Sequence, residues 1–426
     1  MPALPSTANS TRIDHHKVVI VGAGAAGIAT AASLFKRDPT LDIALIDPAE
    51  VHYYQPGWTM VGAGVFSAAS TARSMLSAIP KGVRFIKARV ISFDPAAQSV
   101  VVEDGRIISY EQLVVCPGLT LDWQAIEGLT ETLGRNGVTS NYRYDLAPYT
   151  WQLVQNLKQG RALFTQPPMP IKCAGAPQKA LYLSCDHWLR RERLGAIKAS
   201  FYNSGPVLFG VADYVPALMA YIDKYAVDLN YSHRLVAVDG PGKRATFIHS
   251  LADGSTQTRV EPFDMLHVAP PQVAPAFISS SPLADGAGWL DVDPFTLRHR
   301  QFANVHGLGD AINTSNAKTA AAARKQAPVV ANNVLVALGR SPTLAHYDGY
   351  GSCPLTVERG KIVLAEFKYG GTLAPSFAQW LLDGRQPTRL AWLLKVKLLP
   401  ALYWHGMLKG REWLARPQPA GTEKQS

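Results

Sequence analysis

The chain has 426 residues, 47% of them hydrophobic, with 42 Lys and Arg against 32 Asp and Glu. Its length exceeds that of one ordinary domain, so we expect two intertwined domains and a C-terminal appendage. The net charge of +10 fits an anionic substrate, a phosphate-rich cofactor or an acidic membrane surface, whereas no basic block or motif points to nucleic acid. Four cysteines without zinc-site spacing exclude a secreted disulfide framework and predict no metal.

The first 16 residues are rich in Pro, Ser, Thr and Ala, and they lack the charged start, apolar run and cleavage site of a secretory signal. We therefore expect residues 1–16 to form a flexible leader and the protein to have no cleavable signal peptide. No stretch approaches the ~20 uninterrupted apolar residues of a membrane-spanning helix. Any membrane contact is expected to be peripheral.

Residues 17–35 show the order of strand, tight turn and helix that a dinucleotide-binding fold requires. The turn is Gly22-Ala23-Gly24-Ala25-Ala26-Gly27, and it is expected to hold a pyrophosphate at the positive end of the helix. A second strand, 42–46, ends in Asp47, 20 residues after Gly27, where a carboxylate accepts ribose hydroxyls. These flanks favour cofactor binding over an ordinary glycine-rich turn.

A second, distant element distinguishes FAD from NAD. Residues 305–311 include Gly309-Asp310, whose carboxylate is placed to bond the ribityl chain, and a helix begins soon afterwards with its positive end toward the flavin. Gly-Asp alone is common turn chemistry, but paired with the N-terminal turn it predicts an FAD site. Further cofactor contacts are predicted in this element and in the loops that follow the strands of the first domain. They are Gln55, Gly118, Gly309, Asp310, Lys318 and Thr319.

Residues 153–283 alternate strand-like and helical runs, which predicts a second Rossmann-like domain. At the place where a nicotinamide-dependent enzyme carries its second glycine fingerprint, the chain has Ile171-Lys172-Cys173-Ala174-Gly175. The sequence therefore shows no site for NAD(P)H, and a cysteine stands where the electron donor would bind.

The cysteines divide into two kinds. Cys116 follows a strand pattern and Cys185 lies on a predicted helix, so both are expected to be small buried side chains. Cys173 and Cys353 lie among Gly and Pro residues, and Lys172 precedes Cys173. Loop thiols near cations ionise readily, and the thiolate is the nucleophile. The residues alone leave open whether these two thiols are reactive or merely packed.

The C-terminal segment combines aromatic and basic residues. Four of the nine tryptophans fall in the last 47 residues, among several Lys and Arg, and Pro400 is expected to break the stretch into two short helices. This composition is typical of an interfacial membrane anchor. The alternative is a helical pair that covers the core, since four leucines recur at helical spacing: Leu393, Leu394, Leu398 and Leu402.

Taken together, these motifs give the chain a specific resemblance. They are the glycine turn at residues 22–27 and the segments of residues 52–58, 171–177, 309–310, 318–322, 347–354 and 364–367. The chain resembles the sulfide:quinone oxidoreductases of the flavin-dependent disulfide-reductase superfamily, in the type II branch that includes the mitochondrial enzyme. The resemblance implies an α/β fold with two Rossmann-like domains and a C-terminal helical membrane-association segment. The implied divisions are leader 1–16, FAD-binding parts 17–125 and 291–340, second domain 126–290, C-terminal region 341–415 and disordered tail 416–426.

The resemblance also implies a chemistry for the cysteines. Cys173 and Cys353 are expected to be bridged by a disulfide or trisulfide beside non-covalently bound FAD. Hydrosulfide would attack the bridge and leave a persulfide on Cys353, while the freed Cys173 passes electrons to the flavin. The third cysteine of type I relatives is missing, which favours the two-cysteine mechanism. The group that manages protons stays open between Lys179, His187 and solvent.

The remaining expectations concern partners. The sulfane sulfur would pass to sulfite, a thiol or a growing polysulfide chain, and a membrane quinone would accept the electrons near Phe367 and Tyr369 on the flavin face opposite the cysteines. We expect a peripheral protein of the bacterial inner membrane that is able to form a homo-oligomer. Two alternatives are an enzyme like type II NADH:quinone oxidoreductase and a flavin-binding redox subunit that reduces a cytochrome.

Overall fold

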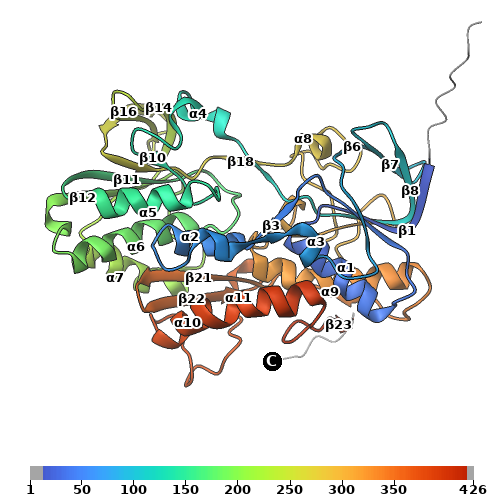
Figure 1. Cartoon of the computed structure of the whole chain (residues 1–426). Helices are drawn as coiled ribbons and strands as arrows, with labels where there is room; N and C mark the ends of the chain where they lie inside the picture. Colours follow the sequence, from blue (N-terminus) through green and yellow to red (C-terminus); the bar gives the residue numbers. More distant parts are fainter. Residues whose placement is uncertain (1–12, 420–426) are drawn as a thin grey trace, which may run out of the picture.

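The computed structural model describes residues 13–419, and its largest unit is a seven-stranded sheet, on the right in Figure 1. Its strand order is β5-β2-β1-β8-β7-β6, with β19 also paired to β8. Five strands run parallel, and β6 and β7 form an antiparallel extension. The strands are β1 (Ile13–Val21), β2 (Ile43–Ile46), β5 (Arg84–Ile86), β6 (Val90–Asp94), β7 (Ser99–Val102), β8 (Ile107–Val115) and β19 (Val305–Gly307).

The register of this sheet brings distant segments to one edge. Val21 of β1 pairs with Val115 of β8, and Gly307 of β19 also pairs with Val115. The glycine turn, the loop to Gly118 and the Gly309-Asp310 segment therefore all leave the sheet at its carboxyl edge, where open α/β sheets bind ligands. Helices α1 (Ala25–Arg37) and α9 (Ala320–Ala337) follow two of these segments and pack against each other.

A second parallel sheet, on the left in Figure 1, has the order β10-β17-β11-β12-β13. Its strands are β10 (Val138–Thr139), β11 (Gly160–Gln166), β12 (Ile197–Asn203), β13 (Asp228–Asn230) and β17 (Met265–His267). Its helices are α5 (Ala147–Asn156), α6 (Ala176–Arg190) and α7 (Val215–Lys224). Beside it lies an antiparallel sheet of β14 (His233–Asp239), β15 (Arg244–Ser250) and β16 (Thr256–Pro262). The predicted α/β class with a second Rossmann-like sheet is confirmed.

Several short elements lie outside the two large sheets. The strands are β3 (Val51–Tyr53), β4 (Ala72–Ser74), β9 (Thr120–Leu121), β18 (Gln272–Val273) and β20 (Ala345–His346). The helices are α2 (Trp58–Val61), α3 (Met75–Ala78), α4 (Leu129–Thr132) and α8 (Ala276–Ser279). The antiparallel hairpin of β21 (Gly351–Glu358) and β22 (Lys361–Phe367) then joins the core of the second unit, because Cys353 and Leu355 pack with side chains of α6 and β12.

The first strand begins earlier than the sequence predicts. Strand β1 starts at Ile13, and Ile13 pairs in register with Ile107 of β8, so residues 13–16 belong to the sheet rather than to a leader. Polar residues extend the strand here because they have partners, as when Nδ1 of His16 lies 3.0 Å from the Asp42 carboxylate. The rest of the predicted leader, residues 1–12, lies outside the described residues.

The C-terminal segment also differs from its prediction. Residues 389–409 form one uninterrupted helical run, named here the C-terminal run, and Pro400 does not break it (Figure 1). It consists of α10 (Arg389–Leu393), a π-helical turn (Leu394–Leu398), α11 (Leu399–Ala401), a second π-helical turn (Leu402–Gly406) and a 3₁₀ turn (Met407–Lys409). Pro400 is tolerated at the start of α11, because the preceding π turn has already interrupted the ordinary hydrogen-bond ladder.

The predicted disordered tail is partly ordered. Strand β23 (Gln418–Pro419) pairs with β20, and residues 420–426 lie outside the described residues. Within residues 13–419 no helix combines the length and apolarity needed to cross a membrane.

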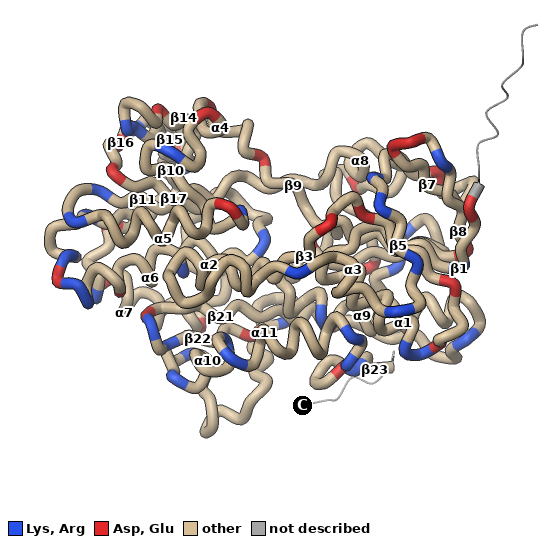
Figure 2. The backbone as a smooth tube through the Cα atoms, in the orientation of Figure 1, with Lys and Arg blue, Asp and Glu red and all other residues tan. Residues whose placement is uncertain are grey.

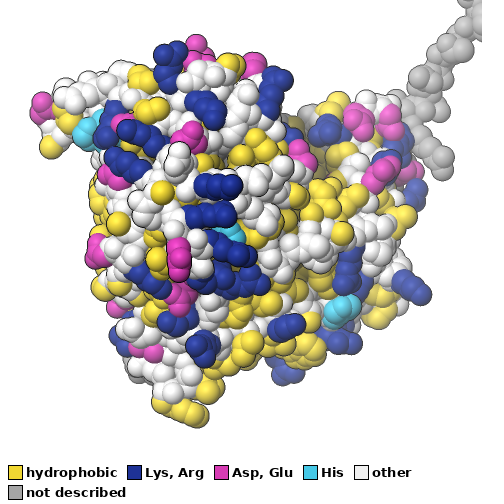
Figure 3. All heavy atoms as spheres, turned by 60° about the vertical axis from the view of Figure 1, so that its left-hand side comes forward, with side chains coloured by type: hydrophobic (Ala, Val, Ile, Leu, Met, Phe, Trp, Pro, Cys, Tyr) yellow, Lys and Arg dark blue, Asp and Glu magenta, His cyan; other side chains and the backbone are white. Residues whose placement is uncertain are grey.

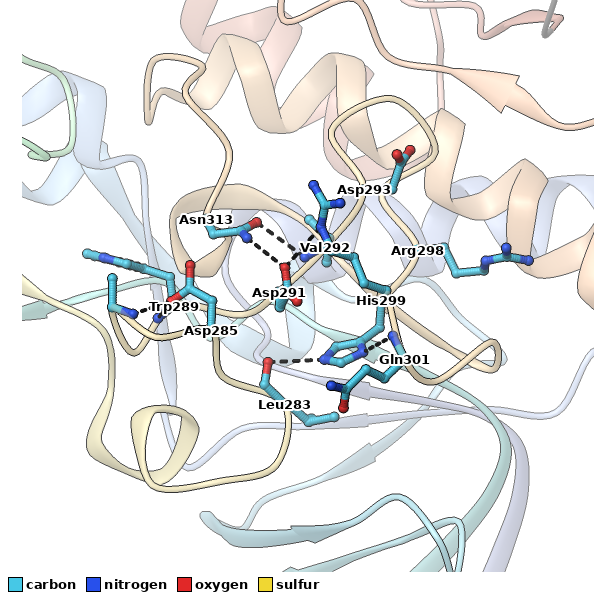
Figure 4. A network of polar contacts seen from close by, with 12 residues as sticks. Leu283, Asp285, Trp289, Asp291, Val292, Asp293, Arg298, His299, Gln301 and Asn313 are labelled. Atoms are coloured by element: carbon cyan, nitrogen blue, oxygen red, sulfur yellow. Dashed lines mark hydrogen bonds and ion pairs between the residues drawn. The ribbon is translucent and has the colours of Figure 1, made fainter.

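A polar network shapes the segment that leads to Gly309 (Figure 4). Nε2 of His299 donates to the Leu283 carbonyl at 3.1 Å, while its Nδ1 accepts from the Gln301 amide at 3.1 Å. Nearby, Asn313 donates to Asp291 at 2.8 Å. These bonds tie residues 283–313 into a compact loop structure, so that β19 and the Gly309-Asp310 turn are held at the edge of the sheet.

Candidate active site

The glycine turn has the geometry of a pyrophosphate cradle. Gly22 has a φ of +105°, and a Cβ there would lie 2.6 Å from the Cys116 carbonyl oxygen. A Cβ on Gly27 would lie 1.8 Å from the carbonyl oxygen of Gly22, so only glycine lets α1 start this close to the strand. Space is open beside Gly24, which caps the amino end of α1. The residues present therefore fit a dinucleotide cofactor whose pyrophosphate lies at the helix terminus.

Asp47 lies against this turn. Its carboxylate accepts from the Ala23 amide at 2.7 Å and from the Ala49 amide at 2.8 Å. The first two residues of α1, Ala25 and Ala26, continue directly from the turn. Gly118, with a φ of +80° and open space where a Cβ would lie, follows β8 at the same sheet edge.

The second predicted FAD element meets the first. A Cβ on Gly309, whose φ is +76°, would lie 3.2 Å from the Ala26 side chain. Lys318 donates from Nζ to the carbonyl oxygens of Asp310 and Ile312, each at 2.8 Å, and burial lowers the pKa of Lys318 to about 8. Burial raises the pKa of the Asp310 carboxyl, against the opposing charges of Lys318 and Lys172.

Helix α9 begins with a side-chain cap that faces this region. The Thr319 hydroxyl accepts from the Ala322 amide at 3.1 Å and so caps the amino end of the helix, which begins at Ala320. The amino end of α9 consequently lies beside the Gly309-Asp310 turn. The sequence predicts this position for a helix whose positive end faces a flavin.

The Cys173 loop is bonded to this flavin-type segment. The Cys173 amide donates to the Lys318 carbonyl at 2.8 Å, and Lys172 forms a parallel bridge with Lys318. The Lys172 ammonium donates to Gln55 Oε1 at 2.9 Å, and its amide donates to Gln272 at 2.7 Å. The loop that replaces the second glycine fingerprint therefore lies directly on the predicted FAD site.

Cys173 and Cys353 come together across 180 positions of sequence. Their Sγ atoms lie 3.8 Å apart and both thiols are free. Cys173 has a left-handed backbone, with a φ of 51°, just before α6, and Cys353 lies within β21. Gly175 permits the contact, because a Cβ there would lie 2.6 Å from the Cys353 sulfur. The pair is in van der Waals contact and needs only a small approach to form a disulfide.

The two thiols differ in acidity. The hydrogen bond from Cys353 lowers the pKa of Cys173 well below its usual value, and the charges of Lys179 and Lys395 lower it further, although burial opposes them. The same hydrogen bond, together with burial, raises the pKa of Cys353 well above its usual value. Of the two thiols, Cys173 is therefore the one whose thiolate is favoured.

Lys179 is the group nearest to that charge. Its Nζ lies 3.1 Å from the Cys173 sulfur, and its side chain is buried on α6. Burial works against its charge, but the Cys173 and Cys353 sulfurs raise the pKa of Lys179 above its ordinary value. His187, the other candidate for proton handling, lies eight positions further along α6 and packs against Trp151. Of the two, only Lys179 contacts the thiols.

A second buried lysine was not identified from the sequence. Lys395, on the first π turn of the C-terminal run, is 3% exposed and donates to the Pro56 carbonyl at 3.1 Å. Burial and the charge of Lys179 lower the pKa of Lys395 to about 8, while the two thiols oppose the shift. The sequence offered one signal for this burial. Lys395 stands between Leu394 and Val396, and a lysine within an apolar stretch is buried when that stretch packs against the core.

The other predicted residues separate from this centre. Cys116 and Cys185 are buried, and burial raises the pKa of each thiol. Both observations agree with the prediction that these cysteines are packed side chains. Phe367 packs with the cluster that contains both reactive cysteines, on the cysteine side of β22. Tyr369 packs instead against the core of the FAD-type unit and donates to the Pro294 carbonyl at 2.8 Å. The structure does not bring these two quinone-site candidates together.

Comparison with known proteins identifies the family. Residues 16–157 match the family model described as pyridine nucleotide-disulphide oxidoreductase. The chain is 37% identical over 400 residues to the mitochondrial sulfide:quinone oxidoreductase of Mus musculus, covering 94% of this chain and 88% of the relative. The chain belongs to the sulfide:quinone oxidoreductase family.

Further members of the sulfide:quinone oxidoreductase family agree with this assignment. The mitochondrial enzyme of Dictyostelium discoideum is 41% identical over 406 residues, covering 94% of this chain and 87% of the relative. The crystal structure of the Aquifex aeolicus sulfide:quinone oxidoreductase matches with a TM-score of 0.76 at 19% identity, covering 95% of this chain and 96% of that chain. This last likeness shows the shared fold.

Proposed function

We propose that this member of the sulfide:quinone oxidoreductase family oxidises hydrosulfide at Cys173 and Cys353 and delivers two electrons through FAD to a membrane quinone. The observation that carries the proposal is the pair of sulfurs 3.8 Å apart on a loop that is hydrogen-bonded to Lys318. A thiol pair at this position connects the sulfur chemistry with the cofactor. It also occupies the place where a nicotinamide nucleotide would bind.

The sulfur steps balance with the disulfide form of the pair as the starting state. Hydrosulfide attacks Cys353, the S–S bond breaks, and the products are a Cys353 persulfide and the Cys173 thiolate. A nucleophilic acceptor such as sulfite, a thiol or a sulfur chain takes the outer sulfur and leaves Cys353 as a thiol. Oxidation of both residues re-forms the S–S bond and releases two electrons and one proton. Cys173 is the better leaving group because its pKa is the lower of the two.

FAD, when bound, would supply a two-electron carrier between the cysteine pair and the quinone, whose reduction takes up two protons. The residues that would hold it are the glycine turn and Asp47 at the dinucleotide end, and Gly309, Asp310 and Lys318 at the flavin end. Lys179 holds the Cys173 thiolate at 3.1 Å and would keep that charge stable until the electrons leave. We assign Lys179 the role of charge stabiliser, and solvent the role of proton acceptor.

The quinone is proposed to enter from a membrane surface that meets the C-terminal run. Trp380 is 86% exposed, and further apolar side chains of this region are exposed, among them Leu390, Leu393, Leu398 and Trp413. Figure 3 shows hydrophobic side chains interspersed with Lys and Arg along the lower edge of the molecule, and Figure 2 shows Lys and Arg along the chain near α10 and α11. Trp404 and Lys395 of this run are buried. One side of the run therefore covers the core, and the other side exposes apolar residues at the surface.

This arrangement fits peripheral attachment to an interface, where exposed aromatic and basic side chains contact lipid. The curated relatives are mitochondrial by name, so attachment to the bacterial inner membrane stays a prediction, as does formation of a homo-oligomer. Phe367 and Tyr369 stay predicted quinone contacts. Phe367 packs with the cysteines and Tyr369 packs with the other core, so Tyr369 is the candidate for a quinone site away from the cysteines.

Anaerobic rapid mixing of the purified flavoprotein with sulfide tests the proposal. Sulfide is expected to bleach the flavin absorbance near its oxidised maximum, and a short-chain quinone is expected to restore it. Cys185→Ser, which alters a buried cysteine outside the pair, is the matched control and is expected to behave as wild type. Bleaching by NADH rather than sulfide, or full-rate bleaching by sulfide after Cys173→Ser and Cys353→Ser together, would contradict it.

A further inference from the structure

The two π turns of the C-terminal run each direct a polar side chain into the protein. The first carries Lys395, which is 3% exposed and whose charge acts on the thiols, and the second carries Tyr403, which is 5% exposed. A π turn adds a residue to the helix and so changes which side chains face inward. Tyr403 lies in the core, whereas Leu398, the last residue of the first π turn, is exposed.

Tyr403 contacts a buried histidine from the other end of the chain. The Tyr403 hydroxyl lies 2.7 Å from Nε2 of His52, and Nδ1 of His52 lies 3.1 Å from the carbonyl oxygen of Ala23. A carbonyl oxygen only accepts, so Nδ1 carries the proton and Nε2 accepts from the tyrosine. Burial lowers the pKa of His52 to about 4, which keeps the ring neutral at pH 7. The two hydrogen bonds then fix the tautomer that carries its proton on Nδ1.

The residue that His52 contacts lies inside the glycine turn. The Ala23 carbonyl accepts from His52, while the Ala23 amide donates to Asp47 at 2.7 Å. Both peptide groups that flank this position are thereby fixed, between Gly22 and Gly24. A pyrophosphate is bound by amides of such a turn and of the helix that follows, so their orientation decides how well the cofactor is held.

The chain just beyond the run is fixed to the same helix. Glu412 forms a two-pronged ion pair with Arg37 of α1, with 2.9 Å between Nη2 and Oε2, and accepts from the Ser33 hydroxyl at 2.6 Å. Gly410 lies so close to α1 that a Cβ there would be 2.6 Å from the Ala32 carbonyl oxygen. Residues 403–412 thus contact the carboxyl half of α1 directly and are linked to the turn before α1 through His52.

From these contacts we propose that Tyr403 and His52 are positioning residues for the FAD-binding turn, and that residues 403–412 hold the turn and α1 in the geometry that retains the cofactor. Tyr403 acts through His52, and His52 acts through the Ala23 carbonyl. This inference rests on the proposed binding of FAD at this turn. It assigns the C-terminal run a task within the protein, separate from its contact with a membrane.

The test compares the rate of FAD release from the purified holoprotein of wild type, Tyr403→Phe and His52→Leu. Free flavin fluoresces more strongly than bound flavin, so its rise after dilution reports release at a temperature far below unfolding. Loss of one buried hydrogen bond with an unpaired nitrogen left behind predicts roughly tenfold faster release from Tyr403→Phe. Glu412→Gln, a mild change that keeps the helix contact, is expected to accelerate release by about threefold.

Tyr225→Phe is the matched control, because Tyr225 is also buried and donates to a backbone carbonyl, that of Val357, at 2.9 Å. It is expected to release FAD as wild type does. Adding Tyr403→Phe to His52→Leu should produce no further acceleration, since both act through one chain of bonds. The proposal is overturned if Tyr403→Phe releases FAD within twofold of wild type or no faster than Tyr225→Phe. A wild-type protein that binds no FAD would instead contradict the proposed function, whereas Cys173→Ser should lose turnover and keep its FAD.

Discussion

Cys173 and Cys353 are the same residue type in contact with each other, yet their surroundings push their acidities in opposite directions. Cys173 lies on a loop before α6 with the Lys179 ammonium 3.1 Å away. Cys353 is 2% exposed within β21, among apolar neighbours of the second core. The pKa of Cys173 is lowered, and that of Cys353 is raised.

The difference shows how one pair supports two tasks. A thiolate near cations is a good leaving group and electron donor, whereas a buried neutral thiol beside it is suited to carry a persulfide. The division follows from position, because the hydrogen bond from Cys353 and the Lys179 ammonium on the first turn of α6 both favour the Cys173 thiolate. Removing one part of this asymmetry at a time tests which group produces it.

The largest effect is expected from replacing either cysteine. Cys173→Ser and Cys353→Ser should each reduce the rate of flavin bleaching by sulfide about 10³-fold or more, because an S–S bond no longer forms to accept the nucleophile. Stopped-flow absorbance at saturating sulfide measures this loss. A variant that keeps more than a tenth of the wild-type rate would show that its cysteine is not part of the relay.

The asymmetry itself is visible in alkylation of the intact, reduced pair, because each thiol shifts the pKa of the other. In the reduced wild-type protein at pH 7, the initial rate of modification by iodoacetamide should be about 10²-fold higher at Cys173 than at Cys353, since only the thiolate reacts. Peptide mass spectrometry over time resolves the site, and the buried Cys116 and Cys185 serve as internal controls. Equal rates at the two positions would remove the basis for their separate tasks.

Local sequence patterns were sufficient for the fold and for much of the cofactor site. The strand-turn-helix at Gly22 and the Gly309-Asp310 turn are each encoded within a few residues, and parallel pairing through β8 brings them to one edge. The contact of Cys173 with Cys353 has no local pattern, because it depends on a hairpin returning 180 positions later. It was expected only from the resemblance.

The C-terminal run shows why the remainder was missed. Helical periodicity assumes 3.6 residues per turn, but the two π turns shift the side-chain register and turn Lys395 and Tyr403 inward. The same irregularity explains why Pro400 does not end the helix. A composition rich in Trp, Lys and Arg therefore indicated an interface without indicating which of its residues reach the active site.

Lys179→Met should weaken the asymmetry from the Cys173 side. Without the ammonium, the pKa of Cys173 rises, and the rate of flavin reduction by sulfide at pH 7 should fall by about 10- to 10²-fold. Raising the pH should recover part of the loss, because the thiolate then forms without help. His187→Gln, a change on the same helix away from the thiols, is the control and should leave the rate unchanged.

Lys395 has the smallest and most diagnostic effect, because its charge is present only over part of the working pH range. Its pKa is lowered to about 8, so the ammonium stabilises the Cys173 thiolate below that pH and is lost as the pH rises through it. The rate constant for flavin reduction at low sulfide should therefore decrease by roughly threefold to tenfold between pH 7 and 9 in wild type.

Three variants decide whether this step in the pH profile belongs to Lys395. Lys395→Met should start at the lower rate and show no step, and Lys395→Arg should keep the higher rate to pH 9, because guanidinium stays charged. Lys397→Met, an exposed lysine on the same π turn, should keep the wild-type profile. Lys318 has a pKa lowered to the same region, so a step that persists in Lys395→Met would place its origin at the flavin end of the site instead. The profile thus separates a charge that acts on the thiols from one that acts on the cofactor, which the rates at a single pH do not distinguish.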